Sequence, residues 1–370
     1  MMSTTGQQVT TTLGADGKLT VAVGNREWAD PTGTEVLVKI EAAPINPSDL
    51  ALLFGMADLA GAEYSPGKLV ADMPAPAVKA MAGRKGQTLD VGAEGAGTVI
   101  AAGDDPYAQS LIGKRVACRS GAMYATHTLT DSRACIPLPD HITAEQGAGA
   151  FVNPLTALGF VETMRAEGFT GIVHTAAASN LGQMLVRLGA TEGIPLVNIV
   201  RSDEQVDILK AIGAEHVVDS SKEDFVPKLV AAIEATGAML GFDAIGGGTM
   251  ASTIMGAMEQ VGSKGAEYSR YGSNVQKKVY IYGALDLGPI VLNRGALGFA
   301  WDVSGWLLIP FLAKQGVEGQ MRLAGKVIQG LTTTFASHYK AKIGLEEMLT
   351  KDVAMAYNAK ATGEKYLVAP

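Results

Sequence analysis

The stretch from Gly171 to Arg201 decides the fold of this chain, and it reads GIVHTAAASNLGQMLVRLGATEGIPLVNIVR. It begins with a short apolar run, residues 171–177, which is typical of a strand buried on both faces. A segment with the apolar spacing of a helix starts at Leu181, and a second apolar run, residues 196–200, ends at Arg201. Strand, turn, helix and strand form a βαβ unit, which predicts a parallel sheet whose first turn holds the pyrophosphate of a dinucleotide.

The turn of this unit departs from the usual G-x-G-x-x-G pattern. Gly182 alone holds a glycine place, where it would let the helix pack closely on the strand. Asn180 stands where glycine is common, and asparagine tolerates the left-handed backbone region. One degenerate glycine loop is weak evidence, so two interpretations stay open. The turn either binds a nucleotide through Ala178, Ser179, Asn180, Leu181 and Gly182 or belongs to a βαβ unit without a ligand.

The end of the second strand favours NADPH over NADH. NAD-binding units usually place an acid there for the ribose hydroxyl, whereas this chain has Arg201 and Ser202. A guanidinium and a hydroxyl suit a 2′-phosphate through charge-assisted bonds. The alternatives are a solvated arginine at a strand end, or Asp203 turning inward to bind the ribose.

Length and composition indicate a well-buried protein of two domains. The 370 residues are too many for one core, and 47% apolar against 18% charged residues excludes general disorder. The net charge is −7 and no basic run occurs, so we expect no nucleic-acid partner. Cys118 and Cys135 are too few for a disulfide framework. Because residues 1–12 do not resemble a signal peptide, we expect a cytoplasmic location.

The most apolar segment, Ala296–Ala313, is too short and too broken by Asp302 and Pro310 to span a bilayer. We therefore expect no membrane partner, and predict a buried helix or a subunit contact in this segment. Trp301 and Trp306 are expected to lie in the core or at that contact.

Secondary-structure patterns change near residue 144. The earlier part predicts a β-rich, partly open barrel, with one strand before residue 30, a helix capped by Ser48 or Asp49, and a long loop over residues 63–90. The later part alternates helices and strands, which predicts a doubly wound α/β sheet. Residues after about 320 return to the first domain. We thus predict a catalytic domain over residues 1–152 and 316–370, and a dinucleotide-binding domain over residues 153–315.

Six motifs in a fixed order resemble the medium-chain dehydrogenase/reductase superfamily, in its zinc-free branch of quinone oxidoreductases and 2-enoyl thioester reductases. They are residues 45–49, 92–97, 121–125 and 153–157, the βαβ turn, and residues 242–248. The resemblance implies a GroES-like barrel joined to a Rossmann domain, with the active site in the cleft between them. It also implies a homodimer, to which the apolar late segment would contribute.

The resemblance implies chemistry without a metal. Zinc ligands of related enzymes fall where this chain has Asn46, Ala93 and the Asn153–Pro154 region, and asparagine and alanine are poor ligands. Glu94 is the one possible ligand left, and we interpret it as a buried carboxylate that holds backbone groups or an arginine. Without a Lewis acid, the favoured reaction is hydride transfer to an already polarised acceptor, such as a quinone, an enone or an enoyl thioester.

Candidate proton donors are few. The tyrosine of the enoyl reductases corresponds to Ala57, so Tyr64 and Tyr124 are the candidate hydroxyls, although both could be packing or surface residues. Asn46 is predicted to lie near the nicotinamide, and His174 to be a satisfied core histidine. The remaining candidates for cofactor contact are Thr156, Gly246, Gly247, Tyr282 and Gly283.

These features predict an NADPH-dependent reductase of a small quinone or enone. The alternatives are a 2-enoyl thioester reductase, against which Ala57 argues, and a protein that binds the cofactor without turnover.

Overall fold

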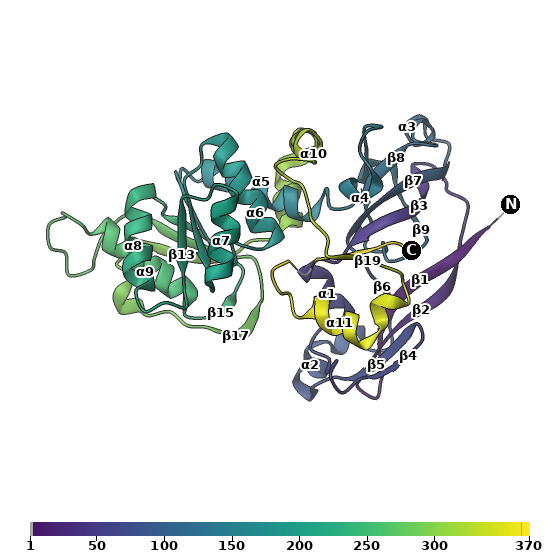
Figure 1. Cartoon of the computed structure of the whole chain (residues 1–370), viewed down its shortest axis with the longest axis horizontal. Coiled ribbons are helices and arrows are strands. Elements are labelled where there is room, and N and C mark those ends of the chain that lie inside the picture. Colours follow the sequence, from purple (N-terminus) through teal and green to yellow (C-terminus); the bar gives the residue numbers. More distant parts are fainter. Residues whose placement is uncertain (1–2, 364) are drawn as a thin grey trace. The chain divides into compact units, whose positions relative to one another are not determined.

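The computed structural model describes residues 3–363 and 365–370. Their contacts form two compact units, Met1–Val152 with Val327–Pro370 and Asn153–Lys326. Each unit has its own hydrophobic core. Figure 1 shows both units, with labels on many of their helices and strands.

The first unit is built from two sheets. The five-stranded sheet has the order β4-β5-β2-β1-β6, and the seven-stranded sheet has the order β10-β8-β7-β3-β20-β19, with β9 also paired to β3. This is the β-rich domain predicted from the sequence. The strands are β1 (Thr4–Leu13), β2 (Lys18–Trp28), β3 (Glu35–Pro44), β4 (Glu63–Ser65), β5 (Lys68–Asp72), β6 (Thr88–Asp90), β7 (Glu94–Ala102), β8 (Arg115–Arg119), β9 (His127–Asp131), β10 (Cys135–Pro137), β19 (Ala341–Ile343) and β20 (Tyr366–Val368).

Short helices close the ends of these sheets. The helix after Pro47 begins with Asn46 as its N-cap, so the predicted caps Ser48 and Asp49 are wrong. Proline at the first helical position explains the shift, because its fixed φ suits that position and its missing N–H is not needed there. The helices are α1 (Pro47–Leu53), α2 (Ala75–Ala80), α3 (Pro106–Ser110), α4 (Ala144–Gly147) and α11 (Lys351–Asn358), with 3₁₀ turns η1 (Ala82–Arg84), η2 (Ser132–Ala134) and η4 (Glu347–Leu349).

Two predictions for this unit are wrong. Residues before 30 form a two-stranded hairpin, β1 and β2, rather than one strand. Residues 63–90 are not a loop, since they contain β4, β5, α2, η1 and β6. Strands of three residues, such as β4 and β6, are too short to show an alternating pattern, and β6 pairs with a strand far away in the sequence.

The second unit is a parallel sheet of six strands in the order β13-β12-β11-β14-β16-β18. Numbered along the chain, this order is 3-2-1-4-5-6, which is that of a Rossmann fold. The predicted doubly wound α/β domain is therefore confirmed. Its strands are β11 (Ile172–His174), β12 (Leu196–Val200), β13 (His216–Asp219), β14 (Leu240–Asp243), β16 (Lys277–Ile281) and β18 (Trp301–Gly305).

Helices connect these strands, and a small parallel pair of strands follows β14. Residues 296–313 do not form one buried helix as predicted, because β18 and the start of α10 divide them. Trp306 is 5.5 Å from Phe311 between ring centroids and lies in the core. The remaining elements are α5 (Val152–Ala166), α6 (Asn180–Glu192), α7 (Asp203–Ala211), α8 (Phe225–Thr236), α9 (Met250–Gly262), α10 (Leu308–Gly330), β15 (Gly246–Gly248), β17 (Asp286–Ile290) and η3 (Arg294–Ala296).

Candidate functional site

The turn between β11 and α6 is shaped by close packing. A Cβ atom at Gly182 would lie 2.0 Å from the Ala177 carbonyl oxygen, so only glycine fits there. Ser179 caps α6, and its hydroxyl accepts a hydrogen bond from the Gly182 N–H at 3.2 Å. The packing role predicted for Gly182 is confirmed. The N-terminus of a helix of this length suits an anion such as a pyrophosphate.

The left-handed residue of this turn is Ala176, with φ of 50°, and not Asn180. Asn180 is the first residue of α6, so the tolerance of asparagine for that region is not used. The chain reverses before the N-cap, four residues earlier than the glycine pattern suggested. An L-residue in this conformation costs about 1–2 kcal/mol, a strain that the buried surroundings of the turn must offset.

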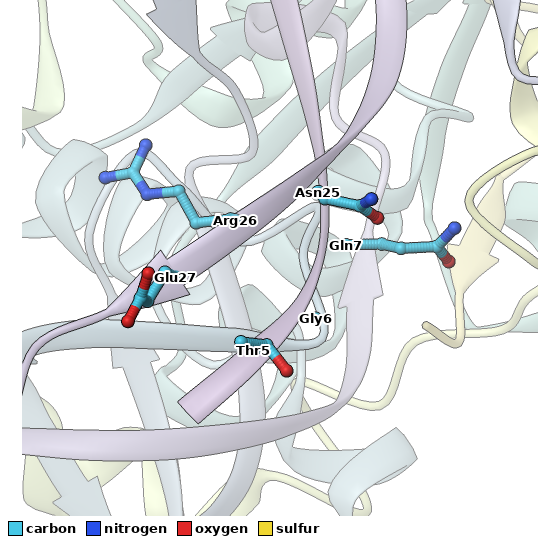
Figure 2. Close-up of a pocket in the computed structure, with 6 residues that line it drawn as sticks. All are labelled: Thr5, Gly6, Gln7, Asn25, Arg26 and Glu27. Carbon is cyan, nitrogen blue, oxygen red and sulfur yellow. The ribbon is translucent and has the colours of Figure 1, made fainter. Parts of the chain in front are cut away.

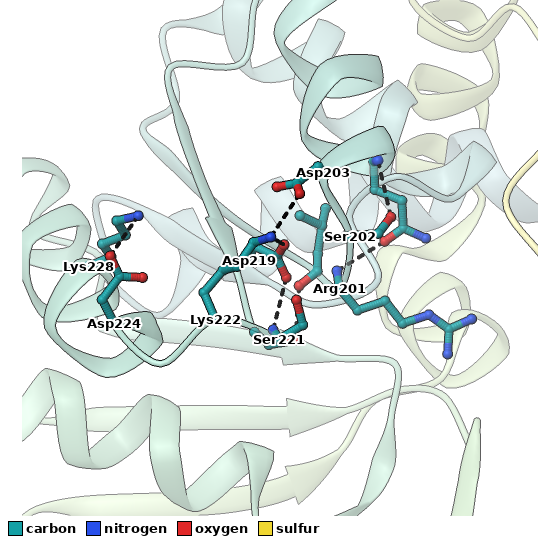
Figure 3. A network of polar contacts seen from close by, with 11 residues as sticks. Arg201, Ser202, Asp203, Asp219, Ser221, Lys222, Asp224 and Lys228 are labelled. Atoms are coloured by element: carbon teal, nitrogen blue, oxygen red, sulfur yellow. Dashed lines mark hydrogen bonds and ion pairs between the residues drawn. The ribbon is translucent and has the colours of Figure 1, made fainter.

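Arg201 lies at the carboxyl end of β12 with its side chain exposed to solvent (Figure 3). Its backbone N–H donates to Gln205 Oε1 at 3.0 Å, which fixes the residue at the start of α7. Ser202 caps α7, accepting from the Gln205 N–H at 3.4 Å. Within the described part of the chain, the Arg201 guanidinium has no hydrogen bond or ion pair. This group is therefore free to bind an anion.

The neighbouring acid, Asp203, is occupied by another cation. Lys222 Nζ lies 2.8 Å from Asp203 Oδ2 and 3.8 Å from Asp219 Oδ2 (Figure 3). The hydrogen bond to Asp203 raises the pKa of Lys222. One alternative from the sequence was that Asp203 turns inward and binds a ribose. In the structure its carboxylate points to Lys222 instead. The tip of β12 thus presents a guanidinium two residues before an acid that is already paired with Lys222.

Asp243 organises the switch point, where β11 and β14 lie side by side. Its buried carboxylate accepts from Thr175 Oγ1 at 2.6 Å, from the Ile245 N–H at 3.0 Å and from the Gly246 N–H at 3.2 Å. The loops that follow the two strands are therefore held together by one side chain. This role was not predicted from the sequence, although an acid at the end of an apolar strand was its signal.

Gly246, Gly247 and Gly283, which were predicted to contact the cofactor, lie where a side chain would collide with other parts of the protein. A Cβ at Gly246 would lie 2.8 Å from the Gly283 carbonyl oxygen, and one at Gly283 would lie 2.4 Å from that of Ala244. At Gly247 a Cβ would lie 2.6 Å from Asp286 Cγ. These close approaches occur within the protein, so they account for the glycines whether or not a ligand lies beside them.

Tyr282 points its hydroxyl into the core of the second unit. The hydroxyl lies 2.8 Å from His174 Nε2. Burial lowers the pKa of His174 to about 3 and raises that of Tyr282. His174 was predicted to be a core histidine with its hydrogen bonds satisfied. It is buried as predicted, but its Nδ1 has no hydrogen-bond partner within the described residues. Thr156, the remaining candidate in this unit, is buried on α5.

In the first unit, Asn46 lies in a buried polar cluster. Its Nδ2 donates to Glu94 Oε1 at 2.8 Å, and its Oδ1 accepts from Lys365 Nζ at 3.1 Å. Both ends of the amide are thus occupied by protein groups. The contact with a nicotinamide stays a prediction, and it requires one of these bonds to be shared or exchanged.

Glu94 is the centre of this cluster and is fully buried. Its Oε2 accepts from the N–H groups of Phe151 and Val152 at 2.8 and 2.9 Å. Burial raises the pKa of Glu94, while the charge of Lys365 opposes that rise. The sequence-based interpretation of Glu94 as a carboxylate that holds backbone groups is confirmed.

Asp49 adds a second buried acid to the cluster. It accepts from the N–H groups of Asn46 and Ala93, both at 2.9 Å. Burial is the main reason that its pKa rises to about 6, and the nearby Glu94 adds to the effect. The first unit therefore contains two carboxylates beside Lys365.

The two candidate proton donors use their hydroxyls elsewhere. Tyr64 donates to the Leu59 carbonyl at 2.8 Å, and the buried Tyr124 donates to the Pro44 carbonyl at 3.2 Å. Neither Lys365 nor Tyr339, whose ring lies 5.9 Å from Lys365 Nζ, was predicted from the sequence. No local pattern marks either residue, because their partners are distant in the sequence.

A hollow of about 540 Å³ lies on the β1–β2 hairpin, and Figure 2 shows its polar lining. None of the predicted site residues lines it. The residues lining the hairpin pocket are Thr5, Gly6, Gln7, Asn25, Arg26 and Glu27.

In the described ranges, no group of three or more His, Cys, Asp or Glu side chains is arranged to hold a metal. No helix in the described part combines the length and apolar character needed to cross a membrane.

Comparison with known proteins agrees with this architecture. Residues 32–151 match the alcohol dehydrogenase GroES-like domain. The human mitochondrial enoyl-[acyl-carrier-protein] reductase is 27% identical over 204 residues, which are 54% of this chain and 48% of that protein. The chain thus spans about half the length of the first curated relatives that it matches.

Solved structures cover the chain more completely. A proposed NADPH:quinone reductase from Mesorhizobium loti is 26% identical, with 100% of both chains covered and a TM-score of 0.74. The Etr1p complex with NADP and crotonyl-CoA is 20% identical, covers 99% of this chain and 100% of that chain, and has a TM-score of 0.70, which supports the fold alone.

The chain resembles the medium-chain dehydrogenase/reductase family, since it combines a GroES-like domain with a six-stranded Rossmann sheet. These relatives and structural neighbours are oxidoreductases.

Proposed function

We propose that this chain is an NADPH-dependent reductase that transfers hydride to a quinone or an activated alkene. The observation that carries the proposal is the free, exposed guanidinium of Arg201 beside the capping hydroxyl of Ser202. A 2′-phosphate needs such donors, and a ribose hydroxyl needs the acid that this position lacks. The pairing of Asp203 with Lys222 supports the same preference.

The second unit would hold the cofactor through groups that fit it. The pyrophosphate would lie at the start of α6, where Ser179, Asn180 and Gly182 form the turn. Arg201 would neutralise the 2′-phosphate at the other end of the adenosine. Bound NADPH supplies a hydride, and the protein's task is then to position the acceptor and stabilise its developing oxyanion.

A quinone or small enone suits the first unit better than a substrate that needs a dedicated donor. Tyr64 and Tyr124 donate to carbonyl groups, and Ala57 has no hydroxyl. A quinone oxygen takes its proton from water, so no such side chain is required. In the first unit, the Asn46 side chain would contact the nicotinamide. Its hydrogen bonds with Lys365 and Glu94 would fix the orientation of the Asn46 amide group.

The second candidate is a 2-enoyl thioester reductase. It is favoured by the relatives named enoyl-[acyl-carrier-protein] reductase and by the neighbour that binds crotonyl-CoA. Ala57 argues against it.

A homodimer and a cytoplasmic location complete the proposal. The edge strand β18 and the exposed Leu307 and Ile309 would form the surface that contacts a second copy.

The activity test follows NADPH absorbance with a quinone, a small enone and crotonyl-CoA in parallel. We expect oxidation with the quinone or the enone, and little with the thioester. A faster reaction with crotonyl-CoA would favour the second candidate. If NADPH binds but none of the three is reduced, the protein binds the cofactor without turnover and the proposal fails.

The cofactor test compares Arg201→Ala with Lys222→Met by calorimetric titration. Arg201→Ala should weaken NADPH about 10- to 100-fold, since charged hydrogen bonds are lost, and leave NADH nearly unchanged. Lys222→Met removes an equal charge that Asp203 already pairs, so it should weaken NADPH less than about threefold. Equal losses for NADPH and NADH in Arg201→Ala would refute the phosphate assignment.

A further inference from the structure

The two cysteines of the chain face each other across two strands. Cys135 on β10 and Cys118 on β8 are Cα partners in an antiparallel pair. They are 17 residues apart in the sequence, and no other cysteine exists in the chain. Both are free thiols in this structure.

The register places this pair in the geometry that a disulfide needs. The N–H of Leu138 donates to the Arg115 carbonyl at 2.9 Å, so positions 138 and 115 form a hydrogen-bonded pair. Pair types alternate along an antiparallel ladder, which makes Cys135 and Cys118 a non-hydrogen-bonded pair. Cα atoms in such a pair are about 4.5 Å apart, within the range of about 4.4–6.8 Å that a disulfide spans.

The same alternation explains Pro137, which pairs with Val116 at a non-hydrogen-bonded position and so needs no N–H in the ladder. Interaction with the neighbouring Cys135 and burial raise the pKa of the Cys118 thiol well above its usual value. In the structure each thiol also donates a weak hydrogen bond to another group, Cys118 Sγ to Met123 Sδ at 4.0 Å and Cys135 Sγ to the Asp131 carbonyl at 3.8 Å. Because the strand register already brings the two Cα atoms together, joining the sulfur atoms requires these weak hydrogen bonds to break and the side chains to rotate.

Access to the pair is through Cys135. The strand β10 has three residues and lies at the edge of the seven-stranded sheet, while β8 lies between β10 and β7. Cys135 retains 5% of its surface exposed and Cys118 none. Short edge strands open locally at low cost, so an oxidant reaches Cys135 first.

We propose that Cys118 and Cys135 form a reversible disulfide when the folded protein meets a peroxide. Cys135 Sγ attacks the peroxide, the O–O bond breaks, and a sulfenic acid and one water form. Cys118 Sγ then displaces the sulfenic oxygen, which leaves as a second water with the Cys118 proton. Two thiols and one hydrogen peroxide thus give one disulfide and two waters.

The bond would close the segment from residue 118 to residue 135 into a covalent loop. This loop contains Tyr124, whose ring is buried in the core of the first unit. Cross-linking a loop of this length restricts the unfolded chain, so oxidation should raise the thermal midpoint of the first unit by about 5 °C. The inference concerns stability and is independent of the proposed reductase activity.

The test treats the reduced, folded protein with hydrogen peroxide, blocks remaining thiols, and digests it with trypsin without a reductant. Cleavage after Arg119 and Arg133 separates the two cysteines, so a disulfide appears as a cross-linked pair of peptides. We expect this pair to form in the native protein and to disappear with dithiothreitol. Two separately oxidised cysteines, or cross-linking only after urea is added, would overturn the proposal.

Cys118→Ser and Cys135→Ser separate the steps. In Cys118→Ser, dimedone should label the sulfenic acid on Cys135, because no second thiol resolves it. In Cys135→Ser, Cys118 should stay reduced under the same treatment. The rise in thermal midpoint should be absent from both variants, and its persistence in either would show that the cross-link is not its cause.

Discussion

Lys365 Nζ donates a hydrogen bond to Asn46 Oδ1 across 3.1 Å, although 319 residues separate the two in sequence. Asn46 in turn donates to Glu94 at 2.8 Å. The three side chains connect the approach to β20, the start of α1 and the start of β7. Burial lowers the pKa of Lys365, and the charges of Glu94 and Asp49 oppose this effect. The charge of Lys365 therefore favours the ionised form of the buried Glu94 carboxyl group.

Lys365→Met should destabilise the first unit by about 2–3 kcal/mol at pH 8, because Glu94 would be left as a buried charge without its cation. The loss should shrink at pH 5, since Glu94 without Lys365 takes up a proton more easily. Differential scanning calorimetry at the two pH values measures this. Lys68→Met, at an exposed position on β5, is the matched control and should change little. An equal loss at both pH values would point to lost packing instead.

Asp49 makes the first unit less stable as pH rises. Its pKa goes from a usual 3.8 to about 6 in the folded state, so the folded state holds the proton more tightly. The stabilisation is complete below pH 3.8 and is lost as pH rises through 6. Relative to Asp49→Asn, the native protein should lose about 3 kcal/mol between pH 3.5 and 7. Hydrogen exchange of β3 and β7 at several pH values reports this difference, and a constant difference would contradict it.

His174 should act in the opposite direction in the second unit. Its pKa falls from a usual 6.5 to about 3, so the folded state excludes the proton. The stabilisation is complete above pH 6.5 and is lost as pH falls towards 3. Relative to His174→Gln, which can keep a bond to Tyr282, the native protein should lose about 1.4 kcal/mol per pH unit between pH 6 and 4. Urea unfolding followed by tryptophan fluorescence in a Trp28→Phe background, which leaves only the tryptophans of the second unit, measures the slope. A slope of the opposite sign would exclude burial as the cause.

Gly182→Ala should destabilise the second unit by about 1–3 kcal/mol, because the new Cβ would overlap the Ala177 carbonyl. It should also weaken nucleotide binding, since α6 must move away from the turn. Gly325→Ala is the matched control: this glycine lies in α10 with no atom within 4 Å of an added Cβ, and helix propensity predicts a gain of about 1 kcal/mol. Thermal midpoints and nucleotide titrations of both variants provide the comparison, and a harmless Gly182→Ala would contradict the packing argument.

The second unit could be predicted from the sequence because its signals are local. Each strand is a short apolar run and each helix is long enough to show its period, so their alternation defined the parallel sheet. Arg201 and Ser202 could be found in the same way, since they directly follow β12. The prediction that Asn180 is the left-handed residue of the turn was wrong. Ala176 adopts that conformation, although its side chain disfavours it.

The first unit could be predicted only in outline. Strands β4, β6, β10, β19 and β20 have three residues each, which leaves no room for an alternating pattern. The polar cluster could not be predicted either, because Asn46, Glu94 and Lys365 meet only in the folded structure. Patterns within a short window contain no information about such pairings.

The position of β20 between β3 and β19 has a consequence for synthesis on the ribosome. This strand pairs with β3 and β19, so the larger sheet is complete only after residues 366–368 have been translated. The Rossmann unit, residues 153–326, is continuous in sequence and can fold while that strand is still absent. Until β20 arrives, Ala43 and Pro44 at the end of β3 lack their strand partners, although β9 pairs with residues 35–39, and Glu94 lacks its lysine. The nascent β-rich unit therefore exposes unpaired backbone groups at this end of β3. Such groups can pair with other chains, so we expect chaperones to be most useful at this stage.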